Sequence, residues 1–248
     1  MSLAGRRFRP GWVLTVAAMA LVALFGRLGL WQLDRARQAE ALNAAAADGA
    51  RLAPIDLREA TQPPAELRFR HVLGHGTFEG AGQILLDNQV QDGIVGVRVL
   101  TPLRLTGTDT RVLVDRGWIA LDPQRRTVPD APVPAGAVEV HGIVDVPAGP
   151  PPLIGHGFDP KADPKALWPF LDLARYATYS GRAVAPFIVH EDAGDAHGFS
   201  RAWQPPQREP SRHRGYALQW FAFALITACV YVALSLERSP RQEPAPSA

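Results

Sequence analysis

The sequence predicts an α+β membrane protein in which two transmembrane helices flank a β-rich extracytoplasmic domain. Two long apolar runs near the ends of the chain predict the helices, because about twenty apolar residues suffice to cross the hydrocarbon core of a bilayer. Between them lie short runs of Val, Ile, Leu and aromatic residues separated by Gly and Pro, a pattern typical of strands. We therefore expect an antiparallel sheet or a partly closed barrel between two membrane helices.

Charge and hydropathy divide the chain into five segments. The arginines at positions 6, 7 and 9, together with an even number of spans, favour cytoplasmic ends. Arginines beyond the first run, such as Arg35 and Arg37, oppose a simple positive-inside count, but long domains translocate with little regard to charge. The predicted segments are a cytoplasmic N-terminus at 1–10, a transmembrane helix at 11–33, a periplasmic β-rich domain at 34–214, a second transmembrane helix at 215–236 and a cytoplasmic tail at 237–248.

The first apolar run, Trp12 to Leu33, has the features of both an anchor and a secretory signal. Its small-residue triplet at 18–20 has cleavage-site spacing, but it lies in the middle of the run, so an uncleaved anchor is favoured. Arg27 lies about 9 Å by helical rise from Leu33, so its long side chain can reach the membrane interface. The alternative is that Arg27 meets an acidic group on the second helix, since charges within spans usually mark function.

The central domain begins with a continuation of the first helix. Strong helix formers follow Arg35 as far as Gly49, which predicts two or three further turns, and prolines then predict a loop over 50–66. The proline-rich stretch 147–169 also predicts a loop, and Asp172 and Gly181 bound a short helix at 172–180. The predicted strands are 69–78, 83–88, 94–105, 110–120, 137–146 and 185–191.

The second apolar run has no charged residue from 215 to 236 and begins beside a histidine. At 100° per residue, His213, Tyr216, Ala217 and Trp220 share one face, and Thr227 and Tyr231 continue it. Two interpretations are open. The aromatic residues can form an interfacial belt beside a solvated histidine, or the face can line a groove that binds a ligand.

Composition argues against several classes of function. Basic and acidic residues nearly balance in the central segment, so a nucleic-acid partner is not expected. The single cysteine, Cys229, lies in the second apolar run, which disfavours thiol redox chemistry. Copper delivery needs thiolate or thioether ligands, and the only methionines are Met1 and Met19.

Six histidines in the central domain make a metal site conceivable: His71, His75, His141, His156, His190 and His197. His71 and His75 share a strand face, but strand rise separates them by about 13 Å, too far to chelate one ion. We therefore interpret these two and His190 as ordinary strand residues.

No enzyme signature is found. Asp115 and Arg116 could form a carboxylate with its orienting partner, but adjacent strand residues point to opposite faces. Ser180, Ser200 and Ser211 lack a nucleophile-elbow motif, and neither a phosphate-binding glycine loop nor a covalent heme motif occurs. We expect a protein that is not an enzyme.

Four motifs resemble the Surfeit locus family of cytochrome c oxidase assembly factors. They are Gly-x-Trp-Gln-Leu-x-Arg at 29–35, a strand running into Thr-Pro-Leu at 96–103, Arg-Gly-Trp at 116–118, and His-x-x-Tyr-Ala-x-x-Trp at 213–220. They occur in the family's order and span nearly the whole chain. The chain departs from the family pattern at Arg212, where Asn is common, at Gln219, where Thr is common, and at Asp115, which replaces a frequent Asn.

The resemblance implies a bacterial inner-membrane protein that binds heme a transiently and assists its insertion into subunit I of cytochrome c oxidase. Membrane lipid surrounds its helices, and heme A synthase is a further expected partner. Imidazole ligates heme iron, aromatic rings line porphyrins, and guanidinium pairs with propionates. The residues expected at the heme are His213, as the iron ligand, with Tyr216, Trp220, Trp31, Arg35, Arg212 and Arg214.

Two other hypotheses remain open. The chain could be a heme-free scaffold that stabilises an oxidase assembly intermediate, or a membrane-anchored periplasmic enzyme of unrecognised type. Whatever the function, the two helices are expected to pair. Trp31 and Trp220 should then pack at one membrane boundary, with Gly26 and Gly29 allowing close backbone approach.

Overall fold

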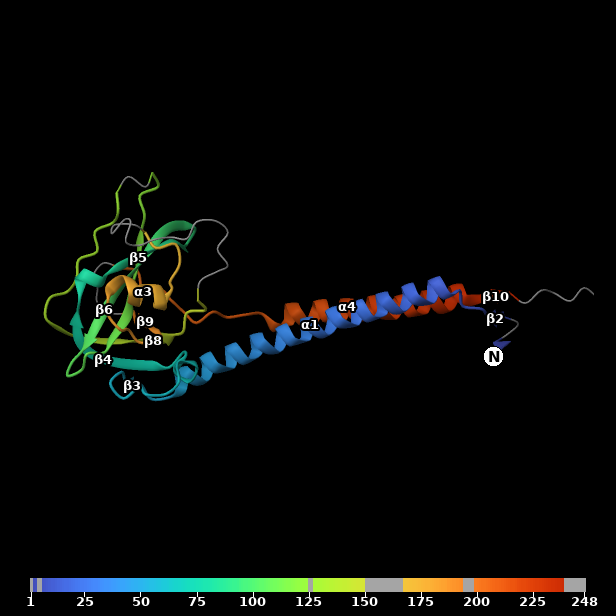
Figure 1. Ribbon diagram of the computed structural model, residues 1–248, viewed down its shortest axis with the longest axis horizontal. Coiled ribbons are helices and arrows are strands. Elements are labelled where there is room, and N and C mark those ends of the chain that lie inside the picture. The colour runs from blue at the N-terminus through green and yellow to red at the C-terminus, as the bar shows by residue number, and fades with distance from the viewer. Residues whose placement is uncertain (1, 4–5, 125–126, 150–166, 194–198, 239–248) are drawn as a thin grey trace, which may run out of the picture. The chain divides into compact units, whose positions relative to one another are not determined.

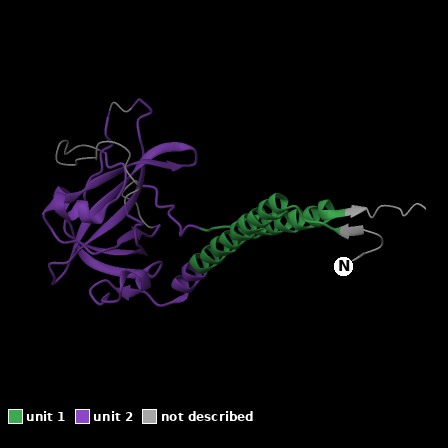
Figure 2. Ribbon diagram, turned by 45° about the vertical axis from the view of Figure 1, so that its right-hand side comes forward, with its two compact units in different colours: residues 1–43, 207–248 green, residues 44–206 purple. Residues whose placement is uncertain are grey.

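The computed structural model describes residues 2–3, 6–124, 127–149, 167–193 and 199–238, which fall into two compact units (Figures 1 and 2). The first unit comprises 1–43 and 207–248, and the second comprises 44–206. The fold class predicted from the sequence, two long apolar helices flanking a β-rich domain, is confirmed.

The first unit consists mainly of α4 (Pro210–Ser235) and most of α1 (Trp12–Arg51), which runs on into the second unit. Short strands β1 (Ser2–Leu3), β2 (Arg6–Phe8) and β10 (Leu236–Arg238) form a small sheet beside the helices. Only 11% and 6% of the most apolar stretches of α1 and α4 are buried, so neither is the core helix of a soluble fold. Both are long and apolar enough to cross a membrane, which makes this a membrane protein with two candidate spans.

The two helices pair in antiparallel fashion within the first unit. Thr15 Oγ1 lies 3.0 Å from Tyr231 Oη, and Phe25 stacks on Trp220 with ring centroids 5.8 Å apart. A Cβ atom on Gly29 would lie 2.6 Å from the Phe221 ring, so this position needs glycine for the close approach. The small residues buried on the two helices within this unit are Ala18, Gly29, Ala36, Ala39, Ala217 and Ser235.

The expected helix contacts are correct in part. Gly29 lies under Phe221, whereas nothing lies within 4 Å of a Cβ built on Gly26, so Gly26 does not serve the contact. Trp220 stacks on Phe25, while Trp31 is half exposed beneath the guanidinium of Arg35 on its own helix. The predicted Trp31–Trp220 packing is therefore wrong, because the α4 ring meets α1 about two turns earlier.

A five-stranded barrel forms the second unit. Its strands are β4 (His71–Phe78), β8 (Ala137–Asp145), β9 (Ile188–Glu191), β7 (Arg111–Ala120) and β6 (Ile94–Leu105), and pairing of β6 with β4 closes the ring. Two further strands lie outside the ring. Strand β3 (Ile55–Asp56) pairs with β4, and β5 (Ile84–Gln91) pairs with β6. Most pairs are antiparallel, as expected, but β7–β9 and β3–β4 are parallel, so the barrel is mixed.

The strand predictions agree with the structure within a few residues at most ends. The first helix continues beyond the apolar run as expected, to Arg51, and α3 (Leu173–Ser180) is capped by the Asp172 carboxylate and ended by Gly181. The expected loop at 50–66 instead contains β3 and the start of α2 (Pro64–Leu67), and a short 3₁₀ turn, η1 (Gly80–Gly82), follows β4. Most of the proline-rich loop, 150–166, lies outside the described residues.

Apolar residues are buried on both sides of the barrel wall. The interior is filled by residues such as Val72, Val114, Val144 and Val189. On the outer side α3 and Trp168 cover a second cluster that includes Leu113 and Ile188. Strand β7 is therefore buried on both faces, and Asp115 and Arg116 are both buried although they point in opposite directions.

Candidate functional site

His213 lies in the first turn of α4 and faces α1. Its Nδ1 atom is 2.8 Å from Gln32 Oε1. An amide oxygen only accepts hydrogen bonds, so Nδ1 carries the proton in this pair, and Nε2 of the neutral ring keeps its lone pair. Among the described residues no hydrogen bond to Nε2 is found. The helix pair thus holds an imidazole in the tautomer and orientation that a metal ligand needs.

The stripe predicted on α4 is largely the face that packs on α1. His213, Ala217 and Trp220 lie on it at helical spacing and are buried or half-buried, while Tyr216 is 49% exposed beside it. Packing between helices therefore accounts for most of the stripe. Tyr216 and Trp31 remain as exposed aromatic rings on the two helices.

The three predicted arginines differ in their partners. Arg214 reaches α1 and pairs with Glu40 at 2.6 Å. Arg212 pairs at 3.4 Å with Glu209, the residue just before its own helix, and both side chains are exposed. Arg35 donates to Gln38 and lies over the Trp31 ring, so its charge is not paired with a carboxylate among the described residues. Arg35 and Arg212 thus keep exposed guanidinium groups near the histidine end of α4, whereas Arg214 serves helix pairing.

Sequence analysis missed Gln32, the hydrogen-bond partner of His213. It stands inside the motif at 29–35, so the motif marked its neighbourhood but not its role. Arg27, for which two roles were open, is exposed on α1 and makes no ion pair with any described residue. This agrees with a side chain that extends toward an interface.

The described histidines of the barrel domain do not assemble a metal site. His71, His75 and His141 lie on the outer surface, next to Asp192, Glu139 and Glu139 respectively. His156 and His197 fall outside the described residues, and within the described part of the chain no group of three metal-ligating side chains occurs.

The interpretation of His190 as an ordinary strand residue is wrong. Its side chain is 7% exposed, and its Nδ1 atom lies 2.6 Å from Asp115 Oδ2, which also accepts a hydrogen bond from Arg98. On the other side, its Nε2 atom is 3.8 Å from Asp145 Oδ2. These residues come together because the closed barrel brings strands β6 to β9 side by side.

Arg98, Asp115, His190 and Asp145 form a largely buried polar row. The interactions among these four charged groups explain how the barrel wall tolerates them. Burial alone would lower the pKa of His190, but the carboxylates of Asp115 and Asp145 outweigh it and hold the pKa above the ordinary 6.5. Burial would raise the pKa of Asp115, but His190 and Arg98 outweigh it and hold that pKa below 3.8. The two carboxylates thus favour the imidazolium form of His190, which lies between them.

Arg116 points into the barrel instead. It is fully buried, donates to the Pro132 carbonyl at 2.8 Å, and lies over the rings of Phe78 and Phe199. Asp115 and Arg116 are thus not a catalytic carboxylate and its orienting partner, which agrees with the sequence interpretation of this pair.

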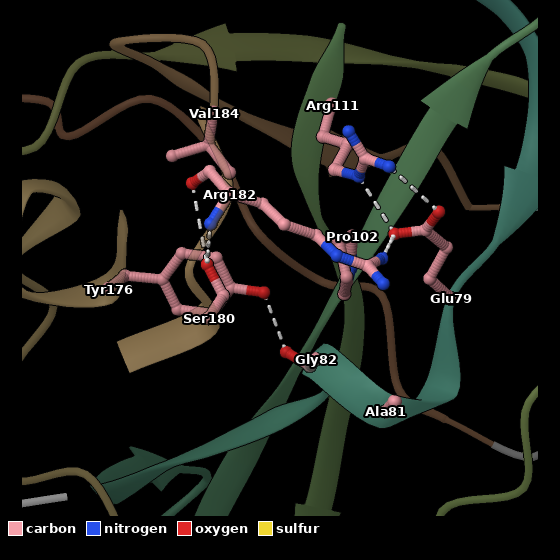
Figure 3. A pocket seen from close by; sticks show the side chains of 9 residues that line it. All are labelled: Glu79, Ala81, Gly82, Pro102, Arg111, Tyr176, Ser180, Arg182 and Val184. Carbon is pink, nitrogen blue, oxygen red and sulfur yellow. Dashed lines mark hydrogen bonds and ion pairs between the residues drawn. The ribbon is translucent and has the colours of Figure 1, made fainter. Parts of the chain in front are cut away.

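A small pocket of about 80 Å³ lies beside α3 (Figure 3). Glu79 accepts a hydrogen bond from Arg111 at 2.8 Å and another from Arg182, and the Arg111 guanidinium holds the pKa of Glu79 below its usual value. Tyr176 donates its hydroxyl to the Gly82 carbonyl at 2.7 Å. The charged groups here satisfy one another in a small space, so this pocket is structural.

Comparison with known proteins now places the chain. Residues 19–225, well over half of the sequence, match the SURF1 family. The chain belongs to the SURF1 family. A SURF1-like protein of Monosiga brevicollis is 27% identical over 94% of this chain and 91% of its own length. The Cytochrome oxidase assembly protein SHY1 of Saccharomyces cerevisiae is 26% identical over 78% of this chain and 54% of its own length.

The SURF1 match confirms the family inferred from the four motifs. Another SURF1-like protein, from Caenorhabditis briggsae, is 23% identical over 88% of this chain and 74% of its own length. The matched region begins within α1 and ends within α4, so it includes both Gln32 and His213. SURF1 family proteins are non-enzymatic, and family membership therefore confirms that the chain is not an enzyme.

Proposed function

We propose that this SURF1 family protein is an assembly factor for cytochrome c oxidase that binds heme a transiently through His213 and assists its insertion into subunit I. The observation that carries the heme proposal is the hydrogen bond from His213 Nδ1 to Gln32 Oε1, which leaves Nε2 available as a ligand. Heme a is the cargo of this protein, and its iron supplies the open coordination position that an imidazole nitrogen fills.

The surroundings of His213 suit such a cargo. Trp31 and Tyr216 present exposed aromatic rings on the two helices, and Trp220 lies one turn beyond Tyr216 on α4. Arg35 and Arg212 offer exposed guanidinium groups, which pair with carboxylates in a bidentate manner and so suit the propionates of heme. Arg214 acts indirectly, because its bond to Glu40 holds α4 on α1.

The oxidase proposal rests on family membership and on the name of the yeast relative, an oxidase assembly protein. Subunit I is the partner that receives heme a, and heme A synthase is the source of the cofactor. We place the protein in a bacterial inner membrane, with spans at 11–33 and 215–236, the 34–214 domain in the periplasm, and residues 1–10 and 237–248 in the cytoplasm.

The test is the visible spectrum of the full-length protein purified from a host that makes heme a. Wild type should show a heme band, and His213→Ala should lose it. The substitution removes one hydrogen bond, to Gln32, which contributes about 1 kcal/mol, so insertion and folding should persist. Gln32→Leu keeps the ligand but removes its orienting partner, and such changes typically cost 10- to 100-fold in metal affinity, so partial heme loss with a shifted band is expected.

His71→Ala and His75→Ala are the matched controls, because both residues lie on the surface of the barrel domain and should leave the band intact. His190→Ala is a poor control, since it breaks the buried row around Asp115. Full heme content with an unchanged spectrum in His213→Ala would refute the ligand assignment. The heme-free scaffold would then be the better account of the protein.

A further inference from the structure

A second polar site lies on the outer wall of the barrel, entirely within the second unit. It is a pocket of about 410 Å³ lined by residues of β5 to β9, by Pro147 and Leu171, and by the segment 202–203. Its volume is at the lower end of those that hold small molecules. No residue of the pocket belongs to the site around His213, so its function is a separate question.

A bulge in β7 builds one side of this pocket. Arg98 pairs with Trp118, and Leu100 pairs with Asp115, so β7 carries one more residue than β6 between the two pairs. Gly117 supplies the extra residue with a φ of +123°, a conformation that other residues rarely adopt. The bulge therefore turns Trp118 to the same side of the sheet as Asp115 and Arg98.

Two nitrogen donors in the pocket lack full sets of partners. His190 Nε2 is buried and makes no hydrogen bond to any described residue, since Asp145 Oδ2 is 3.8 Å away. Arg98 donates through one Nη atom to Asp115, and its remaining N–H groups have no partner among the described residues. A buried donor without a partner costs stability, so a ligand that accepts from it is favoured.

The charged groups around these donors carry one more positive than negative charge when His190 is protonated, so one further anion would neutralise them. Asp115 lies between His190 and Arg98, and Asp145 lies between His190 and Arg68, whose Nε is 3.2 Å away. With His190 protonated, three cations face two carboxylates, and the net charge is +1. A single carboxylate would balance the row and accept from both free donors.

The remaining walls are flat and apolar. Trp203 stacks on His190 with ring centroids 3.8 Å apart and an interplanar angle of 10°. Trp118 lies across the pocket, with its indole nitrogen bonded to the Gln89 carbonyl at 2.8 Å, and Leu171 and Ile188 close the apolar side. Such walls favour a ligand with a ring or a short hydrocarbon body.

We propose that this pocket binds a small molecule that carries one carboxylate on a flat apolar body, with Arg98 and His190 holding the carboxylate and the two tryptophans holding the body. The carboxylate could belong to a free metabolite or to an acidic group carried on a larger partner. The pocket volume suits a single aromatic ring with a short acid chain, which defines the probe.

The probe is 3-phenylpropionate, titrated into the full-length protein in detergent micelles and followed by isothermal titration calorimetry. The uncharged 3-phenylpropionamide is the paired ligand and should bind about tenfold more weakly, as expected for the loss of charge-assisted hydrogen bonds. Labelling with 5-fluorotryptophan places the ligand, because the ¹⁹F signal of Trp203, assigned with Trp203→Phe, should shift on binding. If a peptide ending in phenylalanine binds more tightly than 3-phenylpropionate, the carboxylate comes from a partner, and otherwise from a free molecule.

Two variants test the site itself. Arg98→Lys keeps the charge beside Asp115 but loses the fork of donors, and Ala202→Phe fills the pocket from its exposed rim without touching the polar row. Each should weaken 3-phenylpropionate about tenfold or more. Arg104→Gln, on the same strand but paired with Glu79, is the matched control and should bind as wild type. If Arg98→Lys fails to fold, the binding of 3-phenylpropionate by Ala202→Phe still tests whether the pocket is the binding site.

Equal binding of acid and amide, or wild-type binding in Ala202→Phe, would overturn the proposal. The heme band of the same variants should be unchanged, because these residues belong to the second unit, whereas His213 and its partner Gln32 belong to the first. Failure here therefore leaves the heme proposal standing, and failure of the heme proposal leaves this one standing.

Discussion

At the scale of single residues, His190 ties the stability of the barrel to pH. Its pKa is raised by Asp115 and Asp145, so it contributes stability that is fully present below its ordinary pKa of 6.5 and is lost as pH rises through the folded value. The pKa of Asp115 is lowered, so its contribution is present above 3.8 and is lost as pH falls through its folded value.

We therefore predict that the free energy of unfolding falls as pH rises above 6.5, by at most about 1.4 kcal/mol per pH unit for this one proton. Unfolding of the full-length protein by denaturant, followed by circular dichroism at a series of pH values, measures the slope. His190→Gln should be less stable and should lack this slope, whereas His75→Gln, which changes an exposed pair with Glu139, should retain it. Identical slopes in His190→Gln and wild type would contradict the prediction.

At the scale of elements, Gly29 sets the distance between α1 and α4. A larger residue would place its Cβ atom 2.6 Å from the Phe221 ring, so the helices must separate or shift. Gly29→Leu should weaken helix association by about 1–3 kcal/mol, the usual cost of overpacking, and should lower oxidase assembly. A split reporter fused to the two helices measures the association.

Gly26→Leu is the matched control, because a Cβ atom there meets nothing within 4 Å. The same substitution one turn earlier should therefore leave association unchanged. If both variants associate like wild type, close approach at Gly29 does not determine the pairing of these helices.

At the scale of the whole molecule, the proposed topology places the barrel domain outside the cytoplasm. Leu105 ends β6, just before an exposed turn, so a reporter fused after it follows the fate of this domain. We predict that alkaline phosphatase fused there is active and that β-galactosidase fused there is inactive. The reverse pattern would place the domain in the cytoplasm and would overturn the topology.

Much of this molecule follows from local sequence. Strands such as 94–105 were predicted because β-branched and apolar residues are bounded by Gly and Pro, and α3 was predicted from its cap at Asp172. The two long helices are predicted by the length of their apolar runs alone. The position of His213 on the face of α4 that packs on α1 is predicted by the helical spacing of the residues that follow it. These features depend on neighbours within a few residues, which the sequence displays directly.

The contacts that build the two sites join residues far apart in the chain. Gln32 and His213 stand 181 positions apart, and Asp115 and His190 stand 75 apart, so neither pair could be read from spacing. The barrel closes through β4 and β6, and the parallel β7–β9 pair then brings the polar row together. Local residue patterns specify which elements form and which helices are apolar enough for a membrane. Barrel closure and the packing of α4 on α1 determine which polar groups meet, because those contacts depend on long-range packing.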